Sequence, residues 1–149
     1  MEHEEYMLEA LKLAREAMEG GDVPVGCVIA DAGGNIIGRG RNRREQDRDA
    51  TAHAEIDAIR EACRAKGDFR LTDCTLYVTL EPCPMCAGAI INARVGTVIF
   101  GVRSPESGSC GSVIDLFSES YGHRPRVLTG ILEEECAGVL KEFFEKIRN

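Results

Sequence analysis

The sequence has no apolar run long enough to cross a membrane, no internal repeat and no low-complexity segment. A membrane-spanning helix needs ~20 consecutive apolar residues, so no membrane partner is expected. The start of the chain, Met1 to Glu5, is acidic where a secretory leader would be basic. With a hydrophobic fraction of 44% and no linker, residues 1–149 are expected to form a single globular domain in the cytoplasm.

An excess of basic charge is also lacking, because 18 Lys and Arg residues face 25 Asp and Glu residues. The net charge is −7, and this weighs against nucleic acid as a partner because nucleic-acid-binding domains often carry a basic excess. The distribution of charge matters more than the sum. Five arginines fall between Arg39 and Arg48, and a second small group, Arg124 and Arg126, follows His123. The first group could be a solvated loop, but its place just ahead of the motif described next favours a substrate-facing rim.

The letters HAE at His53 to Glu55 and PCPMC at Pro82 to Cys86 carry the chemistry of the chain. His53, Cys83 and Cys86 supply three zinc ligands, and catalytic zinc sites use three protein ligands and keep a fourth position for water. Glu55 is expected to lie beside that water, where its carboxylate could take a proton and pass it on to a leaving group. The order H-x-E…P-C-x-x-C is the signature of zinc-dependent nucleobase deaminases. No organic cofactor is expected.

A closed structural zinc site is the alternative, and it would need a fourth protein ligand. Such a site has no use for the carboxylate of Glu55. The candidates for the fourth ligand are Cys63, Cys74, Cys110, Cys136 and His123. In the catalytic interpretation, four of the seven cysteines serve as small buried hydrophobic residues in a reducing compartment; these are Cys27, Cys63, Cys74 and Cys136.

The spacing of the motif predicts two helix N-termini directed at one metal ion. Pro84 suits the first position of a helix, which places Cys83 near the N-cap. Thr51 is expected to cap a helix over residues 52–66. The positive ends of both helix dipoles would then face the thiolates. The stripe expected to be buried on this second helix consists of Ala52, Ile56, Ile59, Ala62 and Cys63.

The remaining pattern alternates helices and strands. Helices are predicted over residues 2–19, 83–93, 114–118 and 132–147, and strands over 23–30, 35–41, 75–80, 95–102 and 126–128. A turn over residues 31–35 and a loop over residues 104–112 connect them. A helix, two strands and then strand–helix alternation predict a mixed sheet with helices on both faces.

The sequence around both motifs resembles the bacterial tRNA-specific adenosine deaminases, within the wider cytidine-deaminase superfamily. The resemblance is carried by TAHAEI over residues 51–56 and TLYVTLEPCPMCAGA over residues 75–89, and it extends over nearly the whole chain. It implies an α/β fold of the cytidine-deaminase type, with three α/β/α layers and a mixed five-stranded sheet. It also implies a homodimer with the site at the interface.

The implied activity is hydrolytic conversion of adenosine to inosine at the wobble position of a tRNA anticodon. Zinc would activate water for attack on C6 of a flipped adenine, with Glu55 moving the proton to the departing amine. The resemblance assigns contact with the flipped base to Asn42. Arg43 and Arg44 are further candidate phosphate contacts. The full set of candidate substrate-binding residues is Asn42, Ala54, Ser104, His123, Arg124, Phe144 and Arg148.

Some positions depart from the pattern of this family. Ser104 and Glu106 stand where bacterial members tend to have Asp and Lys, and Ala50 and Gly122 replace Pro and Asn. A glutamate in place of a cation opposes contact with phosphate. Two alternatives therefore stay open: a deaminase of a free nucleobase or nucleoside (guanine, cytosine or adenosine), and a non-enzymatic subunit that presents RNA. Retention of Glu55 argues against the second.

Overall fold

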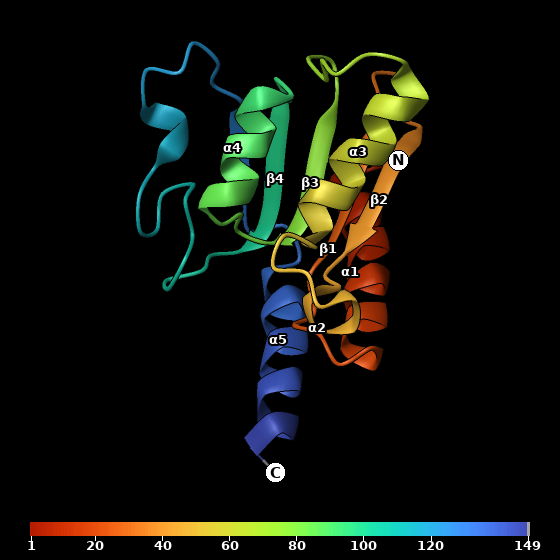
Figure 1. The fold of residues 1–149 in the computed structure, drawn as a ribbon, viewed down its shortest axis with the longest axis vertical. Helices are drawn as coiled ribbons and strands as arrows, with labels where there is room; N and C mark the ends of the chain where they lie inside the picture. Colours follow the sequence, from red (N-terminus) through yellow and green to blue (C-terminus); the bar gives the residue numbers. More distant parts are fainter. Residues whose placement is uncertain (149) are drawn as a thin grey trace.

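The computed structural model of the protein describes residues 1–148. Its centre is a mixed sheet of five strands in the order β2-β1-β3-β4-β5 (Figure 1). β1 is antiparallel to both β2 and β3, whereas β3, β4 and β5 are parallel. The predicted mixed sheet is therefore confirmed. The strands are β1 (Gly26–Ala30), β2 (Ile36–Arg41), β3 (Thr75–Leu80), β4 (Thr97–Val102) and β5 (Arg126–Thr129).

Helices cover both faces of this sheet and make a three-layer molecule (Figure 1). α3 and α4 share one buried cluster with the sheet, and α1 and α5 share the other. α5 extends beyond the end of the sheet (Figure 1). The helices are α1 (His3–Glu19), α2 (Arg44–Asp47), α3 (Ala54–Lys66), α4 (Pro84–Asn92), the 3₁₀ helix η1 (Leu116–Ser118) and α5 (Glu133–Arg148).

Alternation along the central strands divides the core between the two layers. In β1, Cys27 and Ile29 face α3 and α4, while Val28 and Ala30 face α1 and α5. All five residues of β1 are buried because both faces of the strand are covered. Among residues 1–148, no helix has the length and apolar character needed to span a bilayer.

The buried face of α3 differs from the predicted stripe. Ala54, Ala58 and Ala62 are fully buried, whereas Ile56 and Ile59 are only partly buried. The reason lies on β2, where two glycines, at positions 38 and 40, leave no room for side chains: a Cβ on either would overlap a carbonyl oxygen of α3. The helix therefore approaches the strand with its alanines, and its larger apolar residues turn towards the surface.

Several boundaries also differ from expectation. The predicted N-cap at Thr51 is wrong, because α3 starts after His53 and the Thr51 hydroxyl donates to Asp49. β1 starts at Gly26, after Pro24, which has no N–H for the ladder. The short helix α2 was not predicted. By contrast, the strand predicted over residues 75–80 and the start of α4 after Cys83 are confirmed.

Candidate active site

Two helix N-termini converge on the candidate metal ligands. His53 and Cys83 occupy the N-cap positions of α3 and α4, both in extended backbone conformations, and Pro84 takes the first position of α4. His53 Nδ1 lies 3.6 Å from Cys83 Sγ and 3.5 Å from Cys86 Sγ. Two donors on a tetrahedral zinc ion, at ~2.1 Å for nitrogen and ~2.3 Å for sulfur, are ~3.6 Å apart. The donor set therefore fits zinc in both chemistry and spacing.

The cluster has three donors. Within residues 1–148, no fourth His, Cys, Asp or Glu donor joins His53, Cys83 and Cys86. Two of the candidates for a closed site are placed elsewhere: His123 Nε2 lies 2.8 Å from the carbonyl oxygen of Val95, and Cys136 is buried under the opposite face of the sheet. The arrangement is that of an open site rather than a closed structural one.

Hydrogen bonds within the cluster favour one thiolate. Contacts with Cys86 and His53 lower the pKa of Cys83 to about 4 despite partial burial. The pKa of Cys86 is raised, chiefly by its hydrogen bond to Cys83 and by burial. Cys83 also raises the pKa of His53. The thiolate charge favoured at Cys83 lies at the N-terminal end of α4, where the helix dipole is positive.

Glu55 lies beside this cluster and is 3% exposed. Burial raises the pKa of its carboxyl to about 7, and the charge on Cys83 adds to the effect. Glu55 lines the same cavity as His53 and Cys83. A carboxyl group with a pKa near neutrality can both accept and donate a proton under ordinary conditions.

Asn42 connects β2 to the start of α3. Its Oδ1 accepts the N–H of Ala54 at 3.0 Å, an N–H that the first turn of a helix leaves without an intrahelical partner. Because the oxygen is used in this way, the amide NH₂ is the part of Asn42 available to a ligand. No acceptor for it occurs among the described side-chain contacts, and Asn42 lines the cavity.

The cavity has a volume of about 590 Å³ and is lined chiefly by the segments that follow β2 and β4, by α3 and by α5. It brings together the candidate ligands His53 and Cys83, Glu55 and four of the predicted substrate-binding residues. Those four are Asn42, Ser104, Phe144 and Arg148. Phe144 is 45% exposed, while the neighbouring Phe143 packs into the core at 8%.

Three predicted substrate-binding residues do not line this cavity. Ala54 is fully buried, and its N–H is taken by Asn42. His123 and Arg124 lie at a separate hollow beside Gly122. Arg124 Nη2 donates to the carbonyl oxygen of Ser118 at 2.9 Å.

The arginines ahead of α3 are not equivalent. Arg43 donates to the carboxylate of Asp57, with its Nη2 at 2.7 Å, and also pairs with Asp47 at 2.5 Å. These contacts raise the pKa of Arg43, the hydrogen bond to Asp57 having the largest effect. Since two carboxylates neutralise its guanidinium, Arg43 is not the free phosphate contact that the sequence suggested.

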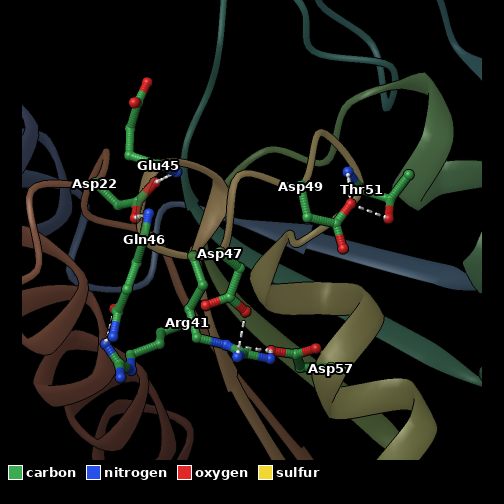
Figure 2. A network of polar contacts seen from close by, with 9 residues as sticks. Asp22, Arg41, Glu45, Gln46, Asp47, Asp49, Thr51 and Asp57 are labelled. Carbon is green, nitrogen blue, oxygen red and sulfur yellow. Dashed lines mark hydrogen bonds and ion pairs between the residues drawn. The ribbon is translucent and has the colours of Figure 1, made fainter.

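Asp22 also holds the segment between β2 and α3 in place. Its carboxylate is 2% exposed and accepts the backbone N–H groups of Glu45 at 2.9 Å and Gln46 at 3.3 Å (Figure 2). These are N–H groups of the first turn of α2, which lack intrahelical partners. Asp22 therefore fixes the loop that carries Arg44 to the rim of the cavity.

Three other arginines, Arg44, Arg103 and Arg148, line the cavity. None of them forms an ion pair with any residue in the described part of the chain. Arg103 was not singled out by the sequence, although it directly follows β4, and its guanidinium lies 5.5 Å from the centre of the Phe100 ring. The free positive charge of the cavity therefore comes from three separate segments.

The sequence also matches a known protein family and several known proteins. The family described as "Cytidine and deoxycytidylate deaminase zinc-binding region" matches residues 1–102. The tRNA-specific adenosine deaminase of Bacillus subtilis is 49% identical over 144 residues, which are 96% of this chain and 89% of that protein. The tRNA(Ile)-lysidine synthase of Deinococcus radiodurans is also 49% identical over 142 residues, 95% of this chain, but this chain spans only 24% of its length.

Solved structures agree with these matches. One from a study of A-to-I editing by tRNA:A34 deaminases at the wobble position of transfer RNA has a TM-score of 0.86 at 43% identity, covering 91% of this chain and 98% of that chain. Guanine deaminase from Bacillus subtilis has a TM-score of 0.66 at 34% identity, covering 100% and 96%.

Proposed function

Since this chain belongs to the family of zinc-binding cytidine and deoxycytidylate deaminases, we propose that it converts adenosine to inosine at the wobble position of a tRNA anticodon. The observation that carries the proposal is one cavity lined by an open cluster of three metal donors and by a separate buried carboxylate, Glu55. The similarity of this chain to a tRNA-specific adenosine deaminase, over nearly the full length of both chains, supports the choice of substrate.

His53, Cys83 and Cys86 are the residues that would hold zinc. When bound to three protein ligands, zinc supplies Lewis acidity and a water acidic enough to serve as a nucleophile near neutral pH. The two helix N-termini stabilise the thiolates that such a site requires. The cysteine and histidine donors favour zinc over magnesium or calcium, which prefer oxygen.

Glu55 carries the proton in the proposed reaction. The carboxylate accepts a proton from the attacking water and delivers it to the amine leaving C6, so that adenosine and water become inosine and ammonia. Its raised pKa, about 7, suits both the accepting and the donating step. Burial at 3% exposure keeps its proton from bulk water.

Asn42 and the rim recognise the substrate. The Asn42 NH₂ group donates to the base because its oxygen is already held by Ala54. Arg44, Arg103 and Arg148 provide unpaired cations for phosphates on either side of the flipped base. Phe144 presents an exposed ring on which a neighbouring base can stack. These features suit a single-stranded loop, whose bases cost little to unstack.

A homodimer is part of the proposal. An apolar hollow of about 300 Å³ lies between α3 and α4 on the face away from α1, and Ile56, Ile59 and Phe69 line it. Phe69 is 52% exposed, and the turning of the isoleucines away from β2 adds to the patch. Burial of such a patch against a second copy is favourable.

The free cysteines suit a reducing compartment, and we propose the cytoplasm.

Deamination of a free base, guanine in particular, is the second candidate. It is favoured by Glu106, which lines the cavity with a negative charge, and by the likeness to guanine deaminase. The same zinc chemistry would then act on a smaller substrate without contacts to phosphate.

A panel of substrates tests the proposal. Zinc-loaded protein is incubated with an anticodon stem-loop carrying A at the wobble position, and separately with adenosine, guanine and cytosine, while inosine and ammonia are measured. We expect inosine to form in the stem-loop. The affinity of the protein for the stem-loop should fall steeply as the salt concentration rises. The matched control is Glu55→Gln, which should release no product. Turnover of guanine alone, insensitive to salt, would replace the first candidate by the second.

A further inference from the structure

Glu81 is a buried carboxylate that the proposed chemistry does not use. It lies between β3 and Cys83 and is 2% exposed. Oε1 accepts the N–H of Ser104 at 3.0 Å, and Oε2 accepts the N–H groups of Cys110 at 2.9 Å and Ser112 at 3.1 Å. The Ser112 hydroxyl also donates to Oε1. Among the described residues no cation pairs with it, so these four donors alone compensate its charge.

The donors all belong to one loop, residues 103–112, which we term the anchored loop. Its first half forms a wall of the cavity through Ser104, Glu106 and Ser107. Its second half passes directly over the carboxylate at Gly108, where a Cβ would lie 2.6 Å from Oε2 and closer still to Oε1. Glycine is therefore required there by close approach. The loop is thus fastened at both ends and in contact at its middle with one side chain.

We propose that Glu81 is a positioning residue, which holds the anchored loop in register as the wall of the cavity and thereby determines affinity for the anticodon loop. The inference rests on the proposed function, because it assigns this wall to the RNA. Glu81 lines the cavity but is not one of the three metal donors, and its carboxylate oxygens accept hydrogen bonds from the anchored loop. Its effect on the reaction passes through the placement of Ser104 and its neighbours.

The chemistry of the contact explains why a carboxylate is needed. Each oxygen of Glu81 faces a backbone N–H group, Ser104 on one side and Cys110 with Ser112 on the other. An amide in its place would turn an NH₂ group towards an N–H group in either orientation, leaving a buried donor without an acceptor. Hydrogen bonds to a charged acceptor are also stronger than those to a neutral one.

Glu81→Gln is therefore the variant to test, with Gly108→Ala as a second variant that disturbs the same contact from the loop. Gly138→Ala is the matched control, because a Cβ at this exposed position in α5 meets no atom within 4 Å. For each protein we would measure zinc content, amide hydrogen exchange at Ser104, Cys110 and Ser112, and the kinetic constants for the wobble-A stem-loop.

We expect both test variants to keep one zinc per chain. Hydrogen exchange at the amides of the anchored loop should be at least about tenfold faster than in the unaltered protein, and KM for the stem-loop should rise roughly tenfold. Their kcat should stay within about threefold of the unaltered protein, and Gly138→Ala should match it throughout. A purely structural role would lower active protein and zinc content together without this division between KM and kcat.

Two results would overturn the inference: unchanged exchange at the three amides in Glu81→Gln, or a loss of zinc and kcat at constant KM. If Glu81→Gln does not fold, Gly108→Ala decides the matter by the same measurements. If the unaltered protein leaves the stem-loop unmodified, the proposed function fails instead, while amide exchange still reports whether Glu81 anchors the loop.

Discussion

The packing of α3 on β2 connects the fold to the candidate active site, and Gly40→Ala tests that connection. A Cβ at Gly40 would overlap the carbonyl oxygen of Ala54 and lie 2.9 Å from both Ala58 N and Asp57 Cβ. Ordinary contacts between carbon atoms are ~3.5–4.0 Å, so the first turn of α3 must move by on the order of 1 Å. That turn follows His53 and contains Glu55.

The size of the effect follows from this displacement. Overpacking of a close contact costs ~1–3 kcal/mol, and for a chain of this length each kcal/mol lowers Tm by ~2–4 °C. A displacement of about 1 Å in catalytic groups can cost ~100-fold in rate. We therefore expect Gly40→Ala to lower Tm by roughly 4–8 °C, to weaken zinc retention and to reduce deamination by about two orders of magnitude.

Two other glycines serve as comparisons for this variant. Gly38→Ala clashes with the Ala58 carbonyl oxygen, one turn further from His53, so it should lower Tm similarly with a smaller loss of activity. Gly138→Ala should leave both unchanged or raise Tm slightly, since Ala is favoured over Gly in a helix. Thermal melts, metal analysis and inosine release measure these effects. A Gly40→Ala protein with the original Tm and full activity would refute the argument that this close approach positions the site.

Three further substitutions test the rim of the cavity. Arg148→Ala should weaken binding of the stem-loop and reduce the salt dependence of log K by ~0.7, the value of about one phosphate contact on a single strand; a salt titration with unchanged slope would exclude that contact. Arg43→Ala should leave this slope unchanged and cost less than ~1 kcal/mol in urea unfolding, because its pair with Asp57 is partly exposed; a reduced slope would return Arg43 to the phosphate contacts. Asp22→Ala should cost ~1 kcal/mol through the lost cap and speed proteolysis between residues 43 and 48, and an unchanged cleavage rate would contradict its anchoring role.

The metal-binding motif was predictable from sequence because its chemistry depends on residue type and spacing. The histidine and the cysteines precede helices whose start signals, such as Pro84, are local. The predicted family, the α/β/α layers and the five-stranded sheet are all confirmed. The assignment of His53, Cys83 and Cys86 to zinc and of Glu55 to proton transfer stays a prediction that the geometry supports.

The errors arose where tertiary contacts decide. The pattern of apolar residues predicted that Ile56 and Ile59 are buried on α3. The glycines of β2 allow only a close approach of the helix, so its alanines are buried instead. Arg43 and Arg44 are adjacent and chemically alike, and only the position of Asp57 separates a structural arginine from a free one. The role of Glu81 could not be predicted, since no local pattern indicates that its hydrogen-bond partners lie about thirty residues later in the chain.

The most direct test of the account measures zinc content and inosine formation together in Glu55→Gln. The exchange of one oxygen for a nitrogen leaves the three metal donors untouched and removes only the group that carries the proton. We predict one zinc per chain, as in the unaltered protein, with deamination of the wobble-A stem-loop reduced by at least ~100-fold. Full activity in a protein that retains its zinc would contradict the central claim that Glu55 transfers the proton.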